Sequence, residues 1–253
     1  MYSFDNQYLY HYTTFESAVK IITSKTMLFS KIERLNDINE SSGYKILFSD
    51  INGQKEEVKR YEDLHKNLKQ ISFTTDEVDK KGFAIPAMWG HYASRGSGVC
   101  LVFDRVKFQS IFKPPIYYCN EVEYKKYKDL SAICYDKEKY SNIDDFVRRN
   151  KDDIFFVKTQ DWKYEQEFRL IAINSDLNSI DISDVLVGVI LYNRNHEKFI
   201  NSVEYKALST IEKDLFFLRY TTTDDNGYNL YDVYGNSVVP KREESFDFSE
   251  IIK

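Results

Sequence analysis

Residues 70–104, QISFTTDEVDKKGFAIPAMWGHYASRGSGVCLVFD, are the stretch that best indicates the fold class of this chain. Both of its ends are rich in β-branched and aromatic residues, so residues 70–75 and 98–104 are predicted to be strands. The proline and the glycines between them predict a loop or a broken helix. No glycine-rich phosphate loop and no regular strand–helix–strand alternation accompany these strands, which favours a mainly antiparallel sheet over a doubly wound one.

Strands and helices are predicted to follow one another irregularly along the rest of the chain. Strand patterns occur at 8–12, 27–30, 116–124, 164–173, 185–191, 215–221 and 228–234, and helical patterns at 15–24, 54–69, 143–157 and 196–208. Thr13 and Glu16 have the spacing of a capping box at the start of the first helix. Only nine glycines and four prolines occur, and no linker or internal repeat is indicated. The chain is therefore predicted to be a single α+β domain over residues 1–253, with mainly antiparallel sheets and flanking helices.

Composition narrows the classes of partner. The formal net charge is −5, so the many phosphate contacts of non-specific nucleic-acid binding would have to come from a local basic patch. Lys125, Lys126 and Lys128 could form one, although a solvated face is the simpler interpretation. The sequence contains neither eighteen consecutive apolar residues nor a secretory leader, so we expect a cytoplasmic protein with no membrane segment.

No metal site is predicted. The cysteines, Cys100, Cys119 and Cys134, are odd in number and lack a CxxC pair, which indicates reduced, buried thiols and not zinc ligands or disulfides. The acidic stretch Asn36-Asp37-Ile38-Asn39-Glu40 lacks the glycine and the spacing of a calcium loop. It is therefore predicted to be a turn.

A histidine, His11, lies in the predicted strand just before the first helix, within Tyr10-His11-Tyr12-Thr13. At such a place it can hydrogen-bond a ligand hydroxyl, while the amide groups of the helix start favour an anion such as a pyrophosphate. The alternative is a core histidine that is bonded to backbone.

Two aromatic side chains surround a glycine and a histidine in Trp89-Gly90-His91-Tyr92, which Gly96-Ser97-Gly98 follows. This pattern suggests a backbone that packs closely around a flat group, because aromatic faces stack on nucleobases or nicotinamide rings. The alternative is an aromatic corner of the core with a glycine turn.

Charged residues alternate within the predicted strand 164–173, where Glu165, Glu167 and Arg169 would share one face. On an exposed sheet face this row would be a salt-bridged ladder, whereas in a cleft the two carboxylates would be an acid/base pair. The sequence leaves both interpretations open.

Taken in order, these segments resemble the bacterial domain-of-unknown-function family 2971. The matching stretches are LYHYTTFESAVKIITSKTMLFS, RLNDINE, ISFTTD, MWGHYASRGSGVCLVFD and KYEQEFRLI, which lie between residues 9 and 171. Ile38 stands where proline is expected in the family, which leaves the shape of that loop open. The family has no agreed activity, so this resemblance implies none.

The chain is more distantly similar to ADP-ribosyltransferases. Those enzymes carry a histidine or arginine on an early strand, a serine, threonine or aromatic residue on a middle strand, and a catalytic glutamate, sometimes as Glu-x-Glu, on a late strand. His11 resembles the first element, residues 72–74 or Tyr92 the second, and Glu165 with Glu167 the third. The resemblance implies an ADP-ribosyltransferase-like split sandwich.

We therefore expect an enzyme that takes NAD as its substrate, in a cleft between two antiparallel sheets, and breaks the nicotinamide–ribose bond. Glu167 would stabilise the oxocarbenium-like ribose, Glu165 would orient or deprotonate the acceptor, and His11 would hold a ribose hydroxyl. The expected NAD-binding residues are His11, Tyr12, Thr13, Ser72, Trp89, Tyr92 and Arg169. The acceptor could be a protein, a nucleic acid or water, and a macromolecular acceptor would fit a toxin or an antiviral (phage-defence) effector.

Two other classes stay open. A metal-dependent nuclease or phosphodiesterase would use His11, His91 and the carboxylates, although the acidic composition counts against it. A non-catalytic nucleotide-binding or interaction domain would bind a nucleotide in an aromatic pocket, with Glu167 in a structural role. Affinity for NAD without turnover would select the binding domain.

Overall fold

The computed structural model describes residues 7–32, 37, 46–51, 53–77, 80–173, 176–193, 195–212, 214–223 and 228–238. The chain divides into two compact units. The first unit comprises residues 1–27, 73–111 and 180–253, and the second comprises 28–72 and 112–179. The expectation of a single domain stays a prediction.

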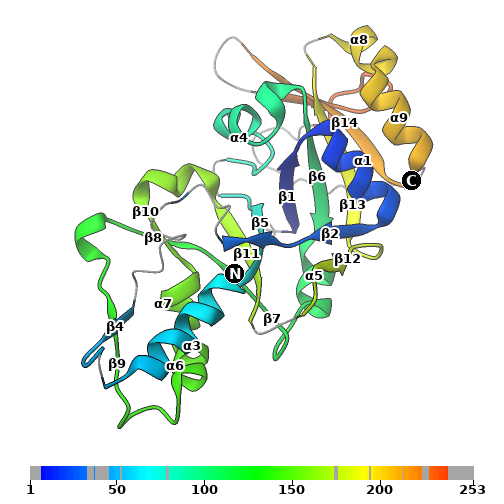
Figure 1. Ribbon diagram of the computed structural model, residues 1–253. Helices are drawn as coiled ribbons and strands as arrows, with labels where there is room; N and C mark the ends of the chain where they lie inside the picture. Colours follow the sequence, from blue (N-terminus) through cyan, green and yellow to red (C-terminus); the bar gives the residue numbers. More distant parts are fainter. Residues whose placement is uncertain are drawn as a thin grey trace. The chain divides into compact units, whose positions relative to one another are not determined.

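The first unit is built on a mainly antiparallel sheet (Figure 1). Its strands are β1 (Tyr8–Thr13), β6 (Val99–Asp104), β13 (Leu186–Tyr192), β14 (Phe216–Thr222) and β15 (Tyr228–Tyr231). They lie in the order β15-β14-β13-β6-β1, and β13 and β14 are the one parallel pair among them. Residues 99–103 of β6 are all buried, as its uninterrupted apolar sequence predicts for a strand that is covered on both faces.

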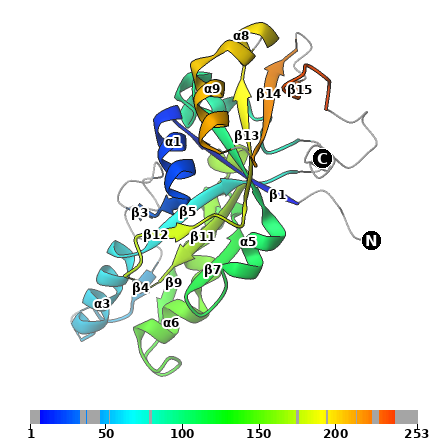
Figure 2. The same cartoon turned by 90° about the vertical axis from the view of Figure 1, so that its right-hand side faces the viewer.

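Helices accompany this sheet in the first unit. They are α1 (Phe15–Ser24), α4 (Pro86–His91), α5 (Arg105–Ile111), α8 (His196–Asn201), α9 (Val203–Ile211) and the 3₁₀ turn η2 (Ser94–Gly96). Helices α1 and α9 lie side by side in both views (Figures 1 and 2). The predicted helix 196–208 is interrupted at Ser202, whose hydroxyl accepts the backbone N–H of Tyr205 and caps α9.

The predicted capping box of α1 is wrong by one residue. Thr14, and not Thr13, is the N-cap, and its hydroxyl accepts the backbone N–H of Ser17 at 3.1 Å. Thr13 still belongs to β1, where it pairs with Val99. The last strand residue and the N-cap are therefore adjacent threonines. Because Thr13 is paired with β6, Thr14 is the residue that caps α1.

The second unit contains the strands β5, β11 and β7 side by side (Figure 2). The larger sheet of this unit is made of β3 (Ser30–Lys31), β5 (Lys69–Thr74, of which 69–72 belong here), β11 (Glu167–Ala172) and β7 (Tyr117–Glu121). Two parallel pairs join β4 (Ile46–Phe48) to β9 (Ile133–Tyr135) and β8 (Glu123–Lys125) to β10 (Val157–Thr159). The short strands β2 (Thr26–Leu28) and β12 (Ser179–Asp181) contain residues of both units.

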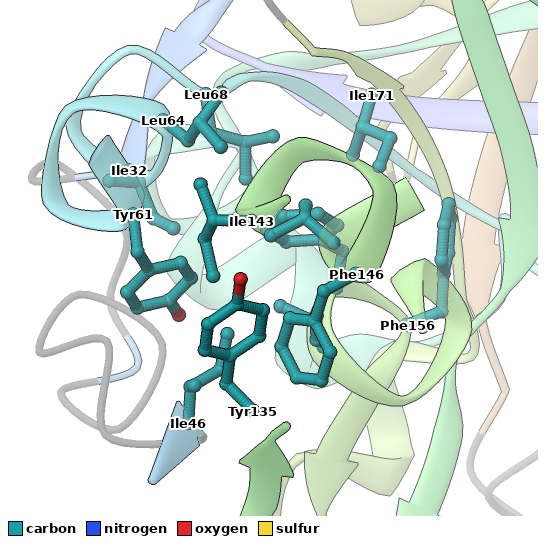
Figure 3. Close-up of a cluster of buried hydrophobic side chains, with 13 residues drawn as sticks. Ile32, Ile46, Tyr61, Leu64, Leu68, Tyr135, Ile143, Phe146, Phe156 and Ile171 are labelled. Atoms are coloured by element: carbon teal, nitrogen blue, oxygen red, sulfur yellow. The ribbon is translucent and has the colours of Figure 1, made fainter. Parts of the chain in front are cut away.

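The helices of the second unit are α3 (Lys55–Lys66), α6 (Ile143–Arg149), α7 (Lys151–Phe155), and the 3₁₀ segments η3 (Tyr127–Asp129) and η4 (Gln160–Glu165). Of these, α3, α6 and α7 contribute side chains to an aromatic-rich core. The predicted helix 143–157 is divided at Asn150 into α6 and α7. The core cluster, drawn in Figure 3, consists of Ile32, Ile46, Tyr61, Leu64, Leu68, Tyr135, Ile143, Phe146, Val147, Ile154, Phe155, Phe156 and Ile171.

The fold class is confirmed as α+β, with mainly antiparallel sheet and flanking helices. The strand predicted at 164–173 begins later than expected, because residues 160–165 form η4 and Gln166 adopts a left-handed conformation with φ 47°. The turn predicted over Asn36–Glu40 lies outside the described residues except for Asp37.

Candidate functional site

The residues predicted to form the site belong to different units. His11, Tyr12, Thr13, Trp89 and Tyr92 lie in the first unit, whereas Ser72, Glu165, Glu167 and Arg169 lie in the second. The common cleft expected from the sequence would join both units, and it stays a prediction. Within each unit, the contacts of these side chains are well defined.

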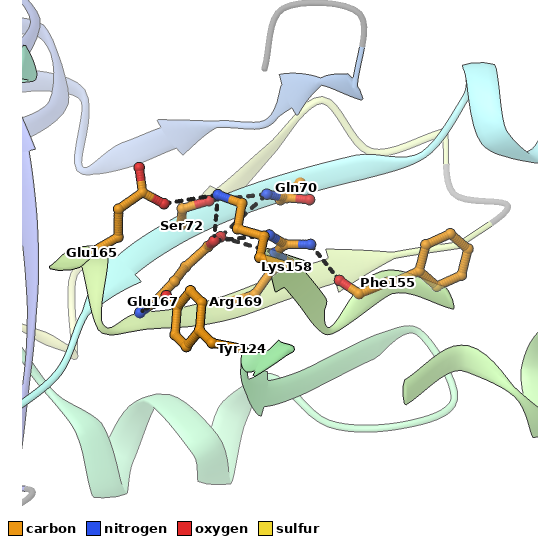
Figure 4. A network of polar contacts seen from close by, with 8 residues as sticks. All are labelled: Gln70, Ser72, Tyr124, Phe155, Lys158, Glu165, Glu167 and Arg169. Atoms are coloured by element: carbon orange, nitrogen blue, oxygen red, sulfur yellow. Dashed lines mark hydrogen bonds and ion pairs between the residues drawn. The ribbon is translucent and has the colours of Figure 1, made fainter. Parts of the chain in front are cut away.

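In the second unit, Glu167 and Arg169 form a two-pronged ion pair on one face of β11. The Arg169 Nε donates to Oε1 of Glu167, and Nη2 donates to Oε2, each at 2.8 Å (Figure 4). A further guanidinium nitrogen, Nη1, donates to the Phe155 carbonyl. Both side chains are only 2% exposed, so this pair is buried. The exposed salt-bridged ladder is therefore the wrong interpretation of the row.

Lys158 joins the second glutamate to this pair. Its Nζ lies 2.8 Å from Oε2 of Glu165 and 2.9 Å from Oε2 of Glu167. The ammonium also lies 5.3 Å from the centroid of the Trp162 ring, within the range of a cation–π contact. We call Lys158, Glu165, Glu167 and Arg169 the charge cluster (Figure 4).

Glu165 reaches the charge cluster from outside the strand. The prediction that Glu165 and Glu167 share a strand face is wrong, because Glu165 ends η4 and Gln166 has a positive φ. The left-handed residue interrupts the two-residue alternation that a strand would impose. Both carboxylates nevertheless meet at the same lysine, which the sequence pattern alone did not identify.

Polar side chains of two neighbouring strands complete the surroundings of Glu167. Gln70 of β5 donates through Nε2 to Ser72 Oγ at 3.0 Å and to Glu167 Oε1 at 3.4 Å. The Tyr124 hydroxyl of β8 accepts the backbone N–H of Glu167 at 2.9 Å. Gln70 and Ser72 are two residues apart on β5, so their side chains point to the same face. Ser72, which was predicted to bind NAD, thus lies in the polar network around Glu167, and its role in NAD binding stays a prediction.

The Glu167 carboxylate stays ionised. Burial by itself would raise its pKa, but the charges of Arg169 and Lys158 and the hydrogen bonds from Arg169 and Ser72 outweigh that effect and hold the pKa well below its usual value. A carboxyl group whose pKa is lowered in this way is a poor general acid or base near neutral pH. Its chemistry is that of a fixed negative charge.

In the first unit, the residues of the β1 motif take separate places. The His11 ring is half-buried and meets Phe73 edge to face, with the ring centroids 5.8 Å apart. The Tyr12 side chain is buried, and its hydroxyl donates to the Gly82 carbonyl at 2.6 Å. Thr13 is paired in the sheet opposite Val99.

Trp89 of α4 packs among aromatic side chains of the same unit. Its indole N–H donates to the Phe83 carbonyl at 2.8 Å, and its ring stacks on Tyr220 with centroids 5.4 Å apart and planes inclined by 5°. Tyr12 meets the same ring edge to face at 5.2 Å. This packing is what the core-corner interpretation of Trp89 expects. Tyr92, at the end of α4, is half-buried.

A buried carboxylate that the sequence did not single out lies near these rings. Asp76 accepts the Gly82 backbone N–H at 2.8 Å, and its other oxygen lies 3.5 Å from the Tyr10 hydroxyl and 3.4 Å from Lys81 Nζ. Burial raises the pKa of Asp76, and Lys81 and the Gly82 amide only partly oppose that effect. In the sequence, Asp76 lies six residues before Gly82, and this spacing was the signal available for a contact between them.

The cysteines differ from one another in exposure. Cys100 is buried and Cys119 is half-buried, but Cys134 is exposed, so the prediction of three buried thiols is wrong for Cys134. Burial raises the pKa of Cys100 and brings that of Cys119 to about 12. Neither thiol is therefore a thiolate nucleophile at neutral pH.

The described residues contain no group of three or more histidine, cysteine, aspartate or glutamate side chains placed to hold a metal ion. Within the same residues, every helix is too short or too polar to cross a lipid bilayer.

Comparison with known families supports the resemblance seen in the sequence. The model of a family of proteins of unknown function, DUF2971, matches residues 88–170, a stretch that includes the WGHY motif, Lys158 and the Glu165–Arg169 segment. The resemblance to this family is confirmed over those residues. No curated protein and no solved structure matches the chain.

Proposed function

We propose that this chain is an NAD-consuming enzyme of ADP-ribosyltransferase type, in which Glu167 stabilises the ribose as the nicotinamide–ribose bond breaks. The observation that carries the proposal is the state of Glu167, a buried carboxylate held ionised by Arg169 and Lys158. Strongly perturbed ionisable groups gather at functional sites, because burial and charge partners are arranged there for chemistry.

The proposed chemistry matches a fixed negative charge. When nicotinamide leaves, positive charge develops on the ribose, and a carboxylate that is already oriented stabilises it without reorganisation. Arg169 and Lys158 provide that orientation, since Arg169 donates to both oxygens of Glu167 and Lys158 contacts Oε2. Orientation or deprotonation of the acceptor is assigned to Glu165 and not to Glu167.

Access to Glu167 sets a requirement on the reaction. The side chain is 2% exposed, so NAD reaches this carboxylate only if neighbouring side chains move when it binds. Lids and loops of many enzymes move in this way on substrate binding. We therefore expect NAD to change the environment of Trp162, which packs against Lys158.

The remaining roles are proposed with the reaction. His11 would hold a ribose hydroxyl, and Tyr12, Thr13, Ser72 and Tyr92 would contribute to NAD binding. The acceptor would be a protein, a nucleic acid or water in the cytoplasm. A macromolecular acceptor would make the chain a toxin or antiviral effector.

The test is NAD binding together with nicotinamide release by the purified chain. Calorimetry measures NAD affinity, and chromatography measures free nicotinamide, with and without cell lysate as a source of acceptor. Release of nicotinamide by the folded wild type supports the proposal. Binding without release would instead favour a nucleotide-binding domain. The absence of both NAD binding and nicotinamide release would overturn the proposal.

A further inference from the structure

One cation of the charge cluster contacts both glutamates. We propose that Lys158 is a positioning residue that holds the side chains of Glu165 and Glu167 in place on a single ammonium group. The inference deepens the proposed function, but its physical content, the pairing of two buried carboxylates, can be tested without NAD.

The geometry of the ammonium suits this role. Lys158 Nζ lies within 2.9 Å of one oxygen from each glutamate, and the lysine side chain is 8% exposed. An ammonium carries three donors that can point in different directions, so it can serve two separate carboxylates. The other cation, Arg169, is already engaged with both oxygens of Glu167 and with the Phe155 carbonyl.

The backbone places Lys158 where both carboxylates can meet it. In the parallel pair β8–β10, Lys158 is opposite Tyr124, whose hydroxyl accepts the Glu167 backbone N–H. The chain then turns through η4, which carries Trp162 to the ammonium and ends at Glu165. One strand pair therefore contacts Glu167 through its backbone and its side chain, and the following turn returns Glu165 to the same lysine.

Charge balance explains why the lysine is needed. The groups that face the Glu167 carboxylate are Arg169, Lys158, Gln70 and Ser72, and Glu165 approaches through Lys158. With two cations and two carboxylates the charge cluster is neutral. Without Lys158, Glu167 keeps Arg169 as a cation but lies near a second buried carboxyl group, so its charged form is less favoured and its pKa rises.

Matched variants separate charge from packing. Lys158→Met keeps an unbranched side chain but removes the charge, and Lys158→Arg keeps the charge. Lys125→Met is the control, because Lys125 also bridges two carboxylates, Glu123 at 3.0 Å and Asp153 at 3.6 Å, but both of these are exposed.

The readouts are thermal melting from pH 4 to 9 and ¹³C NMR titration of labelled glutamate carboxyl groups. In the wild type, the pKa of Glu167 lies below its unfolded value, so its contribution to stability is present above that value and is lost as the pH falls. In Lys158→Met we expect the pKa of Glu167 to rise above its unfolded value, so that stability is lost as the pH increases through the new value.

We expect the pKa of Glu167 in Lys158→Met to lie above its unfolded value, so that the loss of melting temperature is larger at pH 8 than at pH 5. Lys158→Arg should restore most of the wild-type behaviour, and Lys125→Met should follow the wild type at every pH. A loss of melting temperature that does not depend on pH, or an unchanged Glu167 titration, would overturn the proposal.

A second variant keeps the test decisive if Lys158→Met does not fold. The double variant Lys158→Met with Glu165→Gln removes one charge of each sign, which leaves the ion pair of Glu167 and Arg169. We expect the double variant to fold and its melting temperature to depend less on pH than that of Lys158→Met. If Lys158→Met is unfolded, the pH dependence of the double variant should be close to that of the wild type. A double variant that is also unfolded would show that the lysine is needed for packing and would overturn the proposal.

Nicotinamide release distinguishes this inference from the proposed function. If the wild type releases nicotinamide, Lys158→Met should release it at least about tenfold more slowly, with recovery in Lys158→Arg. If the wild type releases none but the Glu167 titration shifts as expected, the pairing by Lys158 stands and the proposed reaction fails.

Discussion

Arg169 holds both carboxylate oxygens of Glu167, its neighbour two residues earlier on the same strand, at 2.8 Å each. Alternate residues of a strand point to one face, so the arginine folds back along β11 onto the glutamate. A two-pronged pair fixes the plane of the carboxylate as well as its position. The contribution of Arg169 to the orientation of Glu167 is therefore made within one strand.

Removal of Arg169 should destabilise the protein strongly. Arg169→Met leaves the buried Glu167 with one fewer cation, and breaking a buried ion pair in this way costs about 3–5 kcal/mol in free energy of unfolding. Urea unfolding measures the loss. Arg60→Met is the matched control, because Arg60 makes the same two-pronged contact with Asp144, at 2.6 and 3.0 Å, on the protein surface.

The surface variant should lose no more than about 1 kcal/mol, since exposed ion pairs contribute little. Equal losses in Arg169→Met and Arg60→Met would mean that burial of the charge cluster does not matter for stability.

Asp76 should make the protein less stable as the pH rises. Its folded pKa is raised by burial, so its contribution to stability is present below its unfolded pKa and is lost as the pH increases through the folded value. Asp76→Asn keeps an oxygen for the Gly82 N–H and removes the charge. Melting curves from pH 4 to 8 should show a decline in the wild type that is weaker in the variant, and parallel curves would refute this assignment.

Gly90 of the WGHY motif and Gly98, which follows the motif in the chain, should respond oppositely to alanine. A Cβ at Gly98 would lie 2.3 Å from the Thr13 carbonyl oxygen and 2.8 Å from the backbone of Ala93, whereas a Cβ at Gly90 meets nothing within 4 Å. Gly90→Ala, within α4, should be neutral or stabilising by up to about 1 kcal/mol.

Gly98→Ala should lower the melting temperature clearly, because the contacts are with backbone and cannot be relieved by a side-chain rotation. If Gly98→Ala has the same melting temperature as the wild type, the backbone of Thr13 and Ala93 does not approach Gly98 as closely as described.

The strands of this fold could largely be predicted from the sequence. Residues 8–12 and 98–104 have β-rich, apolar patterns that the sheet retains as β1 and β6. Breaks within helices were harder to predict, because Asn150 and Ser202 interrupt segments whose apolar spacing continues across them. At both places the helix ends because of a polar side chain or a change in backbone direction. Hydrophobic periodicity does not reveal either feature.

The charge cluster could be predicted only in part. The alternation of Glu167 and Arg169 correctly placed them on one strand face, but Gln166 with its positive φ moved Glu165 off that strand. Lys158 was missed because β8 and β10 have three residues each, too few for a periodic signal, and because their pairing is long-range. Such contacts depend on tertiary structure and not on local spacing.

Nicotinamide release by Glu167→Gln, compared with the wild type, tests the central claim most directly. The substitution keeps the size of the side chain and removes its charge, and thermal melting first establishes that the variant is folded. Glu16→Gln, which removes an exposed carboxylate paired with Lys20, is the control and should release nicotinamide at the wild-type rate. We predict that Glu167→Gln lowers turnover by about a hundredfold or more while NAD affinity changes little. A folded Glu167→Gln that is as active as the wild type would contradict the account.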